Sequence, residues 1–426
     1  MPPSSPASVP PHAEAAAEVR SPLPASMEPV AVRAWTATTA LGTGADAQLA
    51  GLRSGRSGLR PNDFGPLVDG APLPCWIGRV GGLEDAPLPA HLAHWECRNN
   101  RLAWMALQAD GLTGEIEAAT RRHGAARVAI VVGTSTSAIG ATEEAYTRLE
   151  HGADGTPSFP PDLARRAVHT VHALGAFVQE ATGLQGPCMT VATACSSSAK
   201  VFAQGARLLH AGLADAVLVG GVDTLCGSVL YGFNSLQLVA RERCRPFDAE
   251  RNGLSLGEAG GFALLERAGP GDDALKLRGY GESSDAHHMS HPHPEGAGAR
   301  LAMRDALARA GIDAADLDYL NLHGTATPAN DRVEAAAVAA MFPDPLHASS
   351  TKGWTGHTLG AAGIVESVIA LLALREGFLP GTLGCETPDP ACGPQVRTEA
   401  GNTRIDFAMN NSFGFGGNNC SLVFGR

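Results

Sequence analysis

The sequence predicts a layered α/β fold that is built twice. Short apolar runs typical of buried strands alternate with helical stretches in both halves of the chain. In both halves these runs end in polar segments that contain glycine. The 426 residues, of which 44% are hydrophobic, suffice to bury a large core. We therefore expect two related halves, with the chemistry located between them.

The first half, residues 28–275, is expected to begin with a strand at 30–35, followed by a helix rich in Ala and Leu. Further strands are expected at 128–133, 189–194 and 216–222, and a long helix at 196–210. Each of these strands is short and apolar, as is typical of a strand that is buried on both faces.

The second half, residues 276–426, repeats the pattern. A strand is expected at 317–322, helices at 332–341 and 364–374, and strands at 404–408 and 420–424. The last two strands flank a Gly-rich loop at 412–417. This repetition predicts a duplicated architecture with a boundary near residue 275.

Residues 1–27 are rich in Pro, Ala and Ser and lack the apolar run of a secretory signal, so we expect a disordered tail. Met27 directly precedes the first expected strand and is a candidate for the start residue. No stretch approaches 18 uninterrupted apolar residues, so we expect no membrane span.

The net charge of −11 argues against a general nucleic-acid-binding protein, which needs a basic face. The nine cysteines are odd in number and irregularly spaced. This usage favours reduced thiols in a cytoplasmic protein over a disulfide framework.

Cys195 is the first candidate for chemistry, because it lies where an apolar strand runs into a helix. Unpaired N–H groups and the positive dipole end at a helix N-terminus lower the pKa of a nearby thiol. A lone buried cysteine is more commonly a small hydrophobic residue. Other parts of the sequence must therefore support a catalytic role.

Two histidines in the second half provide that support. His323 directly follows an expected strand in the segment His-Gly-Thr-Ala-Thr-Pro, and His357 lies at the entry to a helix. Each alone is more commonly a structural histidine, but both are flanked by Gly at the ends of elements, where side chains project into clefts. A thiolate could attack a carbonyl while imidazole N–H groups stabilise negative oxygen. Lys352 lies five residues before His357.

These segments together resemble the β-ketoacyl-acyl-carrier-protein synthases, the Cys-His-His condensing enzymes of the thiolase superfamily. The resemblance covers residues 29–426, and its segments occur in the family's order: 193–197, 245–248, 323–327, 352–363 and 411–417. It implies a thiolase-like, duplicated α-β-α-β-α layered fold. It also implies decarboxylative Claisen condensation of malonyl-carrier protein with an acyl group held on the enzyme.

The resemblance assigns catalytic roles to five residues. Cys195 would hold the acyl chain as a thioester. His323 and His357 would bind the malonyl thioester carbonyl and support the loss of carbon dioxide. Lys352 and Glu334 would orient the histidines and balance charge.

The resemblance also implies positions around the reacting atoms. The backbone N–H groups of Cys195 and Phe415 would form the oxyanion hole, and Thr325 and Thr327 would bind the phosphopantetheine arm of the carrier protein. A gating loop would open the acyl pocket, with glycine supplying the required backbone freedom. Its residues are Phe413, Gly414, Phe415 and Gly416. Aromatic rings that merely fill the core are the alternative interpretation.

No resident cofactor is implied, because the phosphopantetheine arm arrives on the carrier protein. A structural monovalent-cation site is implied at Asn321, Glu334, Glu366 and Asn411. An acidic carrier protein would need a local basic patch, for which Arg98 and Arg101 are the candidates; a solvated helix face is the alternative.

Two further features are interpreted as peripheral to the chemistry. The spacing of the histidines fits no standard zinc template, and the interleaved prolines indicate an irregular loop. These histidines are His287, His288, His291 and His293. Trp354 departs from the family pattern and is expected either to shape a channel or to fill an interface.

Three other functions compete with a condensing enzyme. A thiolase-like acyltransferase on coenzyme A esters would need a second cysteine near the C-terminus, where Cys420 lies. A non-catalytic chain-length factor would lack the nucleophile, and a cysteine hydrolase would lack the second histidine motif. Segments 99–101 and 231–234 resemble synthases of aryl-polyene pathways. Fatty-acid or polyketide synthesis, and a homodimer or a heterodimer with a related subunit, remain open at this point.

Overall fold

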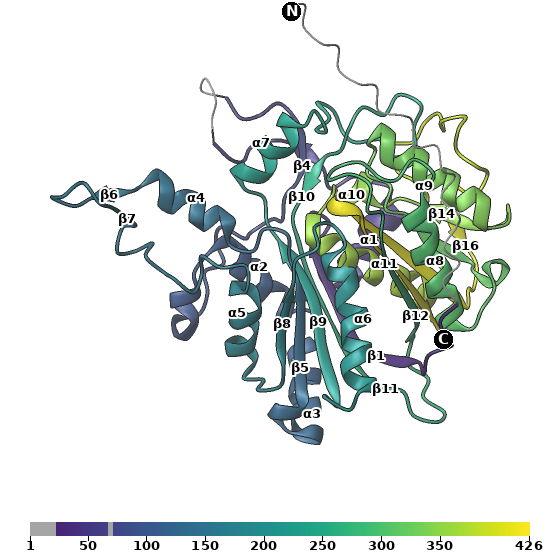
Figure 1. Ribbon diagram of the computed structural model, residues 1–426, viewed down its shortest axis with the longest axis horizontal. Coiled ribbons are helices and arrows are strands. Elements are labelled where there is room, and N and C mark those ends of the chain that lie inside the picture. Colours follow the sequence, from purple (N-terminus) through teal and green to yellow (C-terminus); the bar gives the residue numbers. More distant parts are fainter. Residues whose placement is uncertain (1–22, 67–70) are drawn as a thin grey trace, which may run out of the picture.

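The computed structural model describes residues 23–66 and 71–426 (Figure 1). Most of the predicted tail, residues 1–22, therefore lies outside the described residues. The segment that follows is attached to the body, because the backbone N–H of Met27 donates to the carbonyl of Arg309 at 2.9 Å.

A sheet of 11 strands runs through the molecule and contains five main strands from each half. The first half contributes, in spatial order, β8 (Cys188–Val191), β5 (Val128–Gly133), β9 (Ala216–Asp223), β11 (Ala259–Arg267) and β1 (Val30–Thr39). The second half contributes β14 (His347–Ser349), β13 (Tyr319–Asn321), β17 (Phe407–Gly414), β18 (Asn418–Gly425) and β12 (Lys276–Ser284). The short strand β2 (Gly42–Thr43) pairs with β1.

The two halves of the sheet have the same pairing pattern. In the first half β5 is parallel to β8 and β9, and β11 is antiparallel to β9 and β1. In the second half β13 is parallel to β14 and β17, and β18 is antiparallel to β17 and β12. Only two residue pairs join β1 to β12. The prediction of a duplicated α/β fold is therefore confirmed.

Two helices form a buried layer between the halves (Figure 1). They are α6 (Ser197–His210) and α11 (Ala362–Glu376), and residues 362–374 of α11 are all buried. A methyl group at Gly363 would lie 2.3 Å from the backbone nitrogen of Ala199, so only glycine permits this helix contact. Two of the predicted catalytic residues lie next to these helices, since Cys195 precedes α6 and His357 precedes α11.

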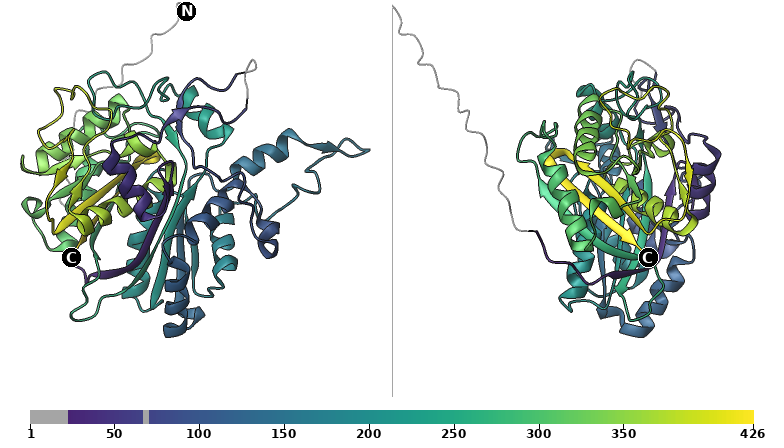
Figure 2. Two further views of the ribbon diagram at one scale, coloured as in Figure 1. Left: turned by 180° about the vertical axis from the view of Figure 1, so that it is seen from behind. Right: turned by 90° about the vertical axis from the view of Figure 1, so that its right-hand side faces the viewer.

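The remaining helices lie on the outer faces of the sheet or among the loops at the top of the view in Figure 1 (Figures 1 and 2). They are α1 (Ala45–Ser54), α2 (Arg98–Leu107), α3 (Leu112–His123), α4 (Ile139–Thr147), α5 (Ala173–Thr182), α7 (Gly227–Ser235), α8 (Ala297–Ala310), α9 (Pro328–Met341) and α10 (Lys352–Thr355). The short strands are β3 (Arg60–Pro61), β4 (Trp76–Gly78), β6 (Glu150–His151), β7 (Pro157–Ser158), β10 (Leu256–Gly257), β15 (Phe378–Leu379) and β16 (Gly401–Asn402). An arm that contains α4, β6 and β7 extends from the body (Figure 2).

Two predicted boundaries differ from the structure. The strand predicted at 189–194 ends at Val191, because Ala194 takes a left-handed conformation with φ 52°. Strand β17 begins at Phe407 and extends to Gly414, into the predicted Gly-rich loop. The loop is thereby reduced to a 3-10 turn, η5 (Phe415–Gly417). Within the described ranges, none of the helices is long and apolar enough to span a bilayer.

Candidate active site

The backbone around Cys195 holds the thiol at a tightly packed turn. Ala194 has φ 52°, a conformation that costs a non-glycine residue about 1–2 kcal/mol. Gly414 packs against this turn, and a methyl group there would lie 3.1 Å from the Cys195 nitrogen. The Cys195 side chain is 5% exposed and lines a cavity of about 290 Å³. The turn therefore presents the sulfur to an enclosed space.

The electrostatic state of Cys195 differs from the sequence prediction. Burial raises the pKa of the thiol to about 12, although the charge of Lys352 and the backbone N–H of Phe415 oppose this shift. The expected lowering of the pKa by the helix N-terminus was wrong, because desolvation of the thiolate outweighs the helix end. The resting side chain is a neutral thiol at neutral pH.

Both predicted histidines lie beside this thiol. His357 Nε2 is 3.0 Å from Cys195 Sγ, and the His323 and His357 rings are 5.3 Å apart at 87°. Burial and the nearby charge of Lys352 lower the pKa of both imidazoles well below the usual value, so both are neutral. Each Nδ1 atom is buried without a hydrogen-bond partner among the described residues. Only for His357 is the Nε2 side seen in contact with the thiol.

Three buried ionisable side chains, Glu334, Lys352 and Glu366, surround the backbone of His323. The Glu334 carboxylate accepts the backbone N–H groups of His323 and Gly324, both at 2.8 Å. Lys352 donates to the carbonyl oxygen of His323 and forms an ion pair with Glu366. Burial raises the pKa of Glu334 to about 7 and that of Glu366 to about 7. These contacts fix the backbone of the His323 loop.

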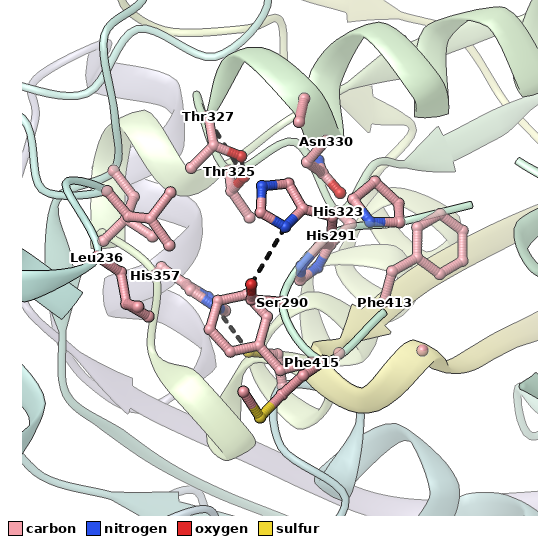
Figure 3. Close-up of a pocket in the computed structure, with 18 of the residues that line it drawn as sticks. Leu236, Ser290, His291, His323, Thr325, Thr327, Asn330, His357, Phe413 and Phe415 are labelled. Atoms are coloured by element: carbon pink, nitrogen blue, oxygen red, sulfur yellow. Dashed lines mark hydrogen bonds between the residues drawn. The ribbon is translucent and has the colours of Figure 1, made fainter. Parts of the chain in front are cut away.

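The cavity opens past the predicted substrate-arm and gating residues (Figure 3). Thr325 and Thr327 line it, and their hydroxyl groups are 2.9 Å apart. The Phe413 ring lies 5.9 Å from the His323 ring, and the Phe415 ring stacks on Phe233 at 5.6 Å. Gly416, the last residue of the predicted gating loop, is tied to the cavity wall, since its N–H donates to the carbonyl of Met289 at 2.7 Å.

Asp331 is a site residue that the sequence reasoning missed. It is fully buried on α9, and its carboxylate accepts the N–H groups of Phe247 at 2.8 Å and Ala326 at 3.2 Å. These two residues are left-handed, with φ 61° and 68°. Asp331 therefore stabilises the strained turn between Thr325 and Thr327. Its position one helical turn before Glu334, on the same helix face, was the available signal.

Asp223 is a second residue that was missed, at the end of β9. Its buried carboxylate accepts the hydroxyl of Thr134 at 2.6 Å, the N–H of Ser135 at 2.8 Å, and both the N–H and hydroxyl of Thr136 at 2.9 and 2.7 Å. The loop after β5 is thereby held against η4 (Leu359–Ala361), which follows His357. An acidic residue closing an otherwise apolar strand was the signal in the sequence.

The predicted docking arginines are engaged within the protein. Arg98 pairs with Glu84 and with Glu258, whose side chain is 0% exposed. Arg101 pairs with Glu96 at 2.5 Å and donates to the carbonyl of Glu84 at 2.8 Å. Internal carboxylates therefore balance both charges, and docking at this helix stays a prediction.

Trp354 does not line the cavity. It is 4% exposed and packs in the main hydrophobic core. Of its two expected roles, filling space within the protein agrees with this position.

The predicted cation-site residues are adjacent, but several of their oxygens already have partners. Glu334 accepts three N–H donors, and Asn411 Oδ1 accepts from Ser421 at 2.7 Å. Asn321 Oδ1 and one oxygen of Glu366 are buried without a partner among the described residues. The cation site stays a prediction.

Comparisons with known proteins agree with this site. The sequence profile of the β-ketoacyl synthase N-terminal domain matches residues 99–270, and that of the C-terminal domain matches residues 275–386. Nodulation protein E of Rhizobium meliloti is 37% identical over 311 residues, which are 70% of this chain and 76% of that protein.

A mitochondrial 3-oxoacyl-[acyl-carrier-protein] synthase of Arabidopsis thaliana is 39% identical over 57% of each chain. The chain thus spans less than two thirds of the length of this relative. A ketosynthase solved in complex with its chain length factor, from Xenorhabdus doucetiae, superimposes with a TM-score of 0.83 at 35% identity. That comparison covers 93% of this chain and 98% of the other. The chain belongs to the β-ketoacyl synthase family and has its thiolase-like fold.

Proposed function

We propose that this protein is a 3-oxoacyl-[acyl-carrier-protein] synthase. It condenses malonyl-carrier protein with an acyl group on Cys195, and carbon dioxide is lost. The observation that carries the proposal is the contact of 3.0 Å between the Cys195 sulfur and His357 Nε2, with His323 on the wall of the same buried cavity.

The first step transfers the acyl group. His357 Nε2 accepts the thiol proton as Cys195 attacks the carrier-bound thioester, because at about pH 7 a thiol with a pKa of about 12 needs a base in contact with it. The carbon–sulfur bond to the carrier protein breaks, and the carrier leaves as a thiol that takes up this proton. We assign stabilisation of the oxyanion to the N–H groups of Cys195 and Phe415.

The second step forms the new carbon–carbon bond. The malonyl carboxylate leaves as carbon dioxide, and its electron pair forms an enolate. The enolate oxygen accepts hydrogen bonds from His323 and from His357, and for this donation the neutral His357 ring must carry its proton on Nε2 in place of Nδ1. Two neutral imidazoles in a water-poor pocket can donate these bonds. The enolate carbon attacks the acyl carbonyl on Cys195, the carbon–sulfur bond to the enzyme breaks, and the released sulfur takes up one proton from solvent. No resident cofactor takes part in this proposal.

Intact-mass analysis tests the acylation step. The protein would be incubated with a panel of acyl-carrier proteins, and we expect a mass gain equal to one acyl group in the wild type but not in Cys195→Ala. Cys392→Ala is the matched control, because Cys392 is a free, partly buried thiol away from the cavity. Acylation that persists without Cys195 would overturn the mechanism. The groups accepted would identify the acyl chain and separate fatty-acid from polyketide or aryl-polyene synthesis.

Carrier-free coenzyme A esters test the main alternative. A thiolase-like enzyme would use Cys420 as a second catalytic cysteine, but this residue lies inside β18 with 0% exposure and does not line the cavity. We therefore expect turnover to require malonyl-carrier protein and to survive Cys420→Ser. Loss of acyl exchange on coenzyme A esters in that variant would favour the thiolase-like reaction.

We also propose that β8 pairs with a partner subunit. This strand ends the sheet order and is hydrogen-bonded on one side only, to β5, and its four residues are partly exposed. An unpaired edge strand favours pairing with another chain. The relative from Xenorhabdus doucetiae is described in complex with a chain length factor. Sedimentation alone and with a co-expressed related subunit would distinguish a homodimer from a heterodimer.

Carrier-protein docking at α2 is proposed with a modified test. Reversal of Arg98 would leave the buried Glu258 beside a like charge, so this change would compromise folding. Arg101→Ala is the usable variant, because Arg101 is partly exposed. We expect a higher KM for carrier-bound substrate and an unchanged KM for a small thioester. Equal effects on both substrates would exclude docking at this position.

A monovalent cation between Asn321 and Glu366 is also part of the proposal. Their unpartnered oxygens support it, and a bound cation would balance the negative charge of Glu366 next to Lys352. Thermal unfolding in potassium, sodium and tetramethylammonium salts at equal ionic strength tests it. We expect a higher Tm with the small cations, and no such difference in Asn321→Leu.

A further inference from the structure

The rim of the cavity contains a pair of histidines that the proposed reaction does not use. The rim segment, residues 285–293, connects β12 to α8, and Met289, Ser290 and His291 line the cavity mouth (Figure 3). His288 and His291 are exposed to solvent. Their chemistry is therefore open to ligands that reach the surface.

The two imidazoles converge on one point. His288 Nδ1 and His291 Nδ1 are 3.1 Å apart, and the hydroxyl oxygen of Ser290 lies 3.5 and 3.2 Å from them. Two nitrogens bound to one tetrahedral zinc ion at its usual bond length are separated by about 3.3 Å. The observed separation lies within the tolerance expected for metal ligands.

The hydrogen bonds of His288 Nδ1 decide whether a metal ion can take the place of the proton between the two histidines. The backbone N–H of Ser290 donates to His288 Nδ1 at 3.1 Å, so this nitrogen carries no proton, and a metal ion would displace that N–H from its lone pair. The contact with His291 then consists of a single proton between two nitrogens. A divalent cation can take the place of that proton when the His291 ring carries its own proton on Nε2, so both rings bind as neutral ligands.

We propose that His288 and His291, with Ser290, bind a divalent transition-metal ion such as Zn²⁺ at the cavity rim. Over residues 23–66 and 71–426, no group of three or more His, Cys, Asp or Glu side chains forms a metal site. Water would complete the coordination, so binding is reversible and not structural. The spacing of the histidines in the sequence fits no standard zinc template, but the fold brings the Nδ1 atoms of His288 and His291 together.

Metal binding would restrain the gating loop. The carbonyl of Met289, between the two ligands, accepts the N–H of Gly416 at 2.7 Å, and the N–H of Asp285 donates to the carbonyl of Gly417 at 2.9 Å. Fixing the rim segment therefore fixes the loop that would have to move. Metal binding and the restraint of the gating loop do not depend on the proposed function. Only a resulting loss of turnover would rest on it.

Calorimetric titration of zinc chloride tests the binding. The titrated protein carries Cys195→Ser, which removes the catalytic thiol as a competing ligand. We expect one ion per chain and a loss of more than about tenfold in affinity in His288→Ala/His291→Ala, because both protein nitrogens are removed. His91→Ala/His94→Ala is the matched control, since these histidines have the same spacing and exposure but no recorded Nδ1 contact. Binding that is absent, or equal in the two double variants, would overturn the proposal.

Hydrogen exchange tests the restraint separately from activity. Zinc is expected to slow exchange of residues 412–417 in the Cys195→Ser protein and to have no effect in the variant that lacks His288 and His291. Tight zinc binding without slower exchange would refute the link to the gating loop.

Copper(II) bound at the site is expected to show an electron paramagnetic resonance spectrum with two imidazole nitrogens, and a spectrum with one would overturn the two-histidine assignment.

Discussion

Replacing Asp331 by Asn removes a buried carboxyl group that holds two backbone N–H groups near the entrance to the cavity; burial raises the pKa of this carboxyl, and the hydrogen bonds from Phe247 and Ala326 oppose that shift. The carboxylate binds the N–H groups of Phe247 and Ala326, two left-handed residues on different segments of the chain. An amide of the same size keeps one acceptor oxygen and turns its NH₂ group toward the other N–H. Asp331→Asn therefore loses one hydrogen bond without creating a cavity.

The magnitude follows from the geometry. A hydrogen bond to a charged group contributes about 1.5–3 kcal/mol, so we expect the free energy of unfolding to fall by this amount. Arg251 adds little to the loss, because it lies 3.8 Å from Asp331 and keeps its ion pair with Asp389 at 2.6 Å. Since Ala326 lies between Thr325 and Thr327, the KM for substrates that carry a pantetheine arm is expected to rise as well.

Urea unfolding followed by fluorescence measures this loss, with an unchanged dependence on denaturant. Asp46→Asn is the matched control, because its side chain is 97% exposed and we expect its midpoint to stay at the wild-type value. A second substitution examines the strain. In the Asp331→Asn background, Ala326→Gly is expected to recover about 1 kcal/mol, because glycine adopts the left-handed conformation without a steric penalty. The reasoning is refuted if Asp331→Asn unfolds like Asp46→Asn, or if Ala326→Gly destabilises it further.

Three further predictions concern the Cys195 thiol, the buried Lys352–Glu366 ion pair and the contact between α6 and α11. Because burial raises the pKa of Cys195 to about 12, alkylation of the sulfur by iodoacetamide is expected to accelerate about tenfold per pH unit between about pH 7 and 9; a flat profile would contradict a neutral resting thiol. Lys352→Met leaves Glu366 unpaired and is expected to lower the free energy of unfolding by about 3–5 kcal/mol; adding Glu366→Gln should restore most of it, and a failure to do so would argue against the buried pair. Gly363→Ala is expected to destabilise the protein because its methyl group would meet the backbone of α6 at 2.3 Å, whereas Gly114→Ala, with open space around it, should raise the Tm slightly; similar Tm shifts would disprove the close helix contact.

The chemical identity of the site could be predicted from the sequence because it depends on residue types in a fixed order. Cys195, His323 and His357 each follow or precede an apolar element, and such junctions place side chains at the same edge of an α/β sheet. The structure brings all three to one cavity. The repeated strand pattern likewise predicted the duplication that the sheet order shows.

The protonation state of Cys195 could not be predicted in this way. A helix N-terminus is a local feature that is visible in the sequence, whereas desolvation depends on everything packed around the sulfur. Gly414 approaches the Cys195 turn from a strand more than 200 residues away in the chain. Burial therefore reversed the expected direction of the pKa shift.

The surface predictions depended on neighbours that the sequence does not reveal. Arg98 looked like a free cation on a helix, but Glu258, from a distant part of the chain, binds it. Asp331 looked like an ordinary helix residue until the fold placed two left-handed N–H groups against it.

The sequence by itself determined the duplicated α/β architecture and the set of reactive groups, because periodicity and residue type act locally. The tertiary structure alone decided which charges are paired, which groups are neutral and which backbone turns are held under strain. Those properties depend on long-range contacts and on the exclusion of water, as the neutral Cys195 thiol beside His357 illustrates.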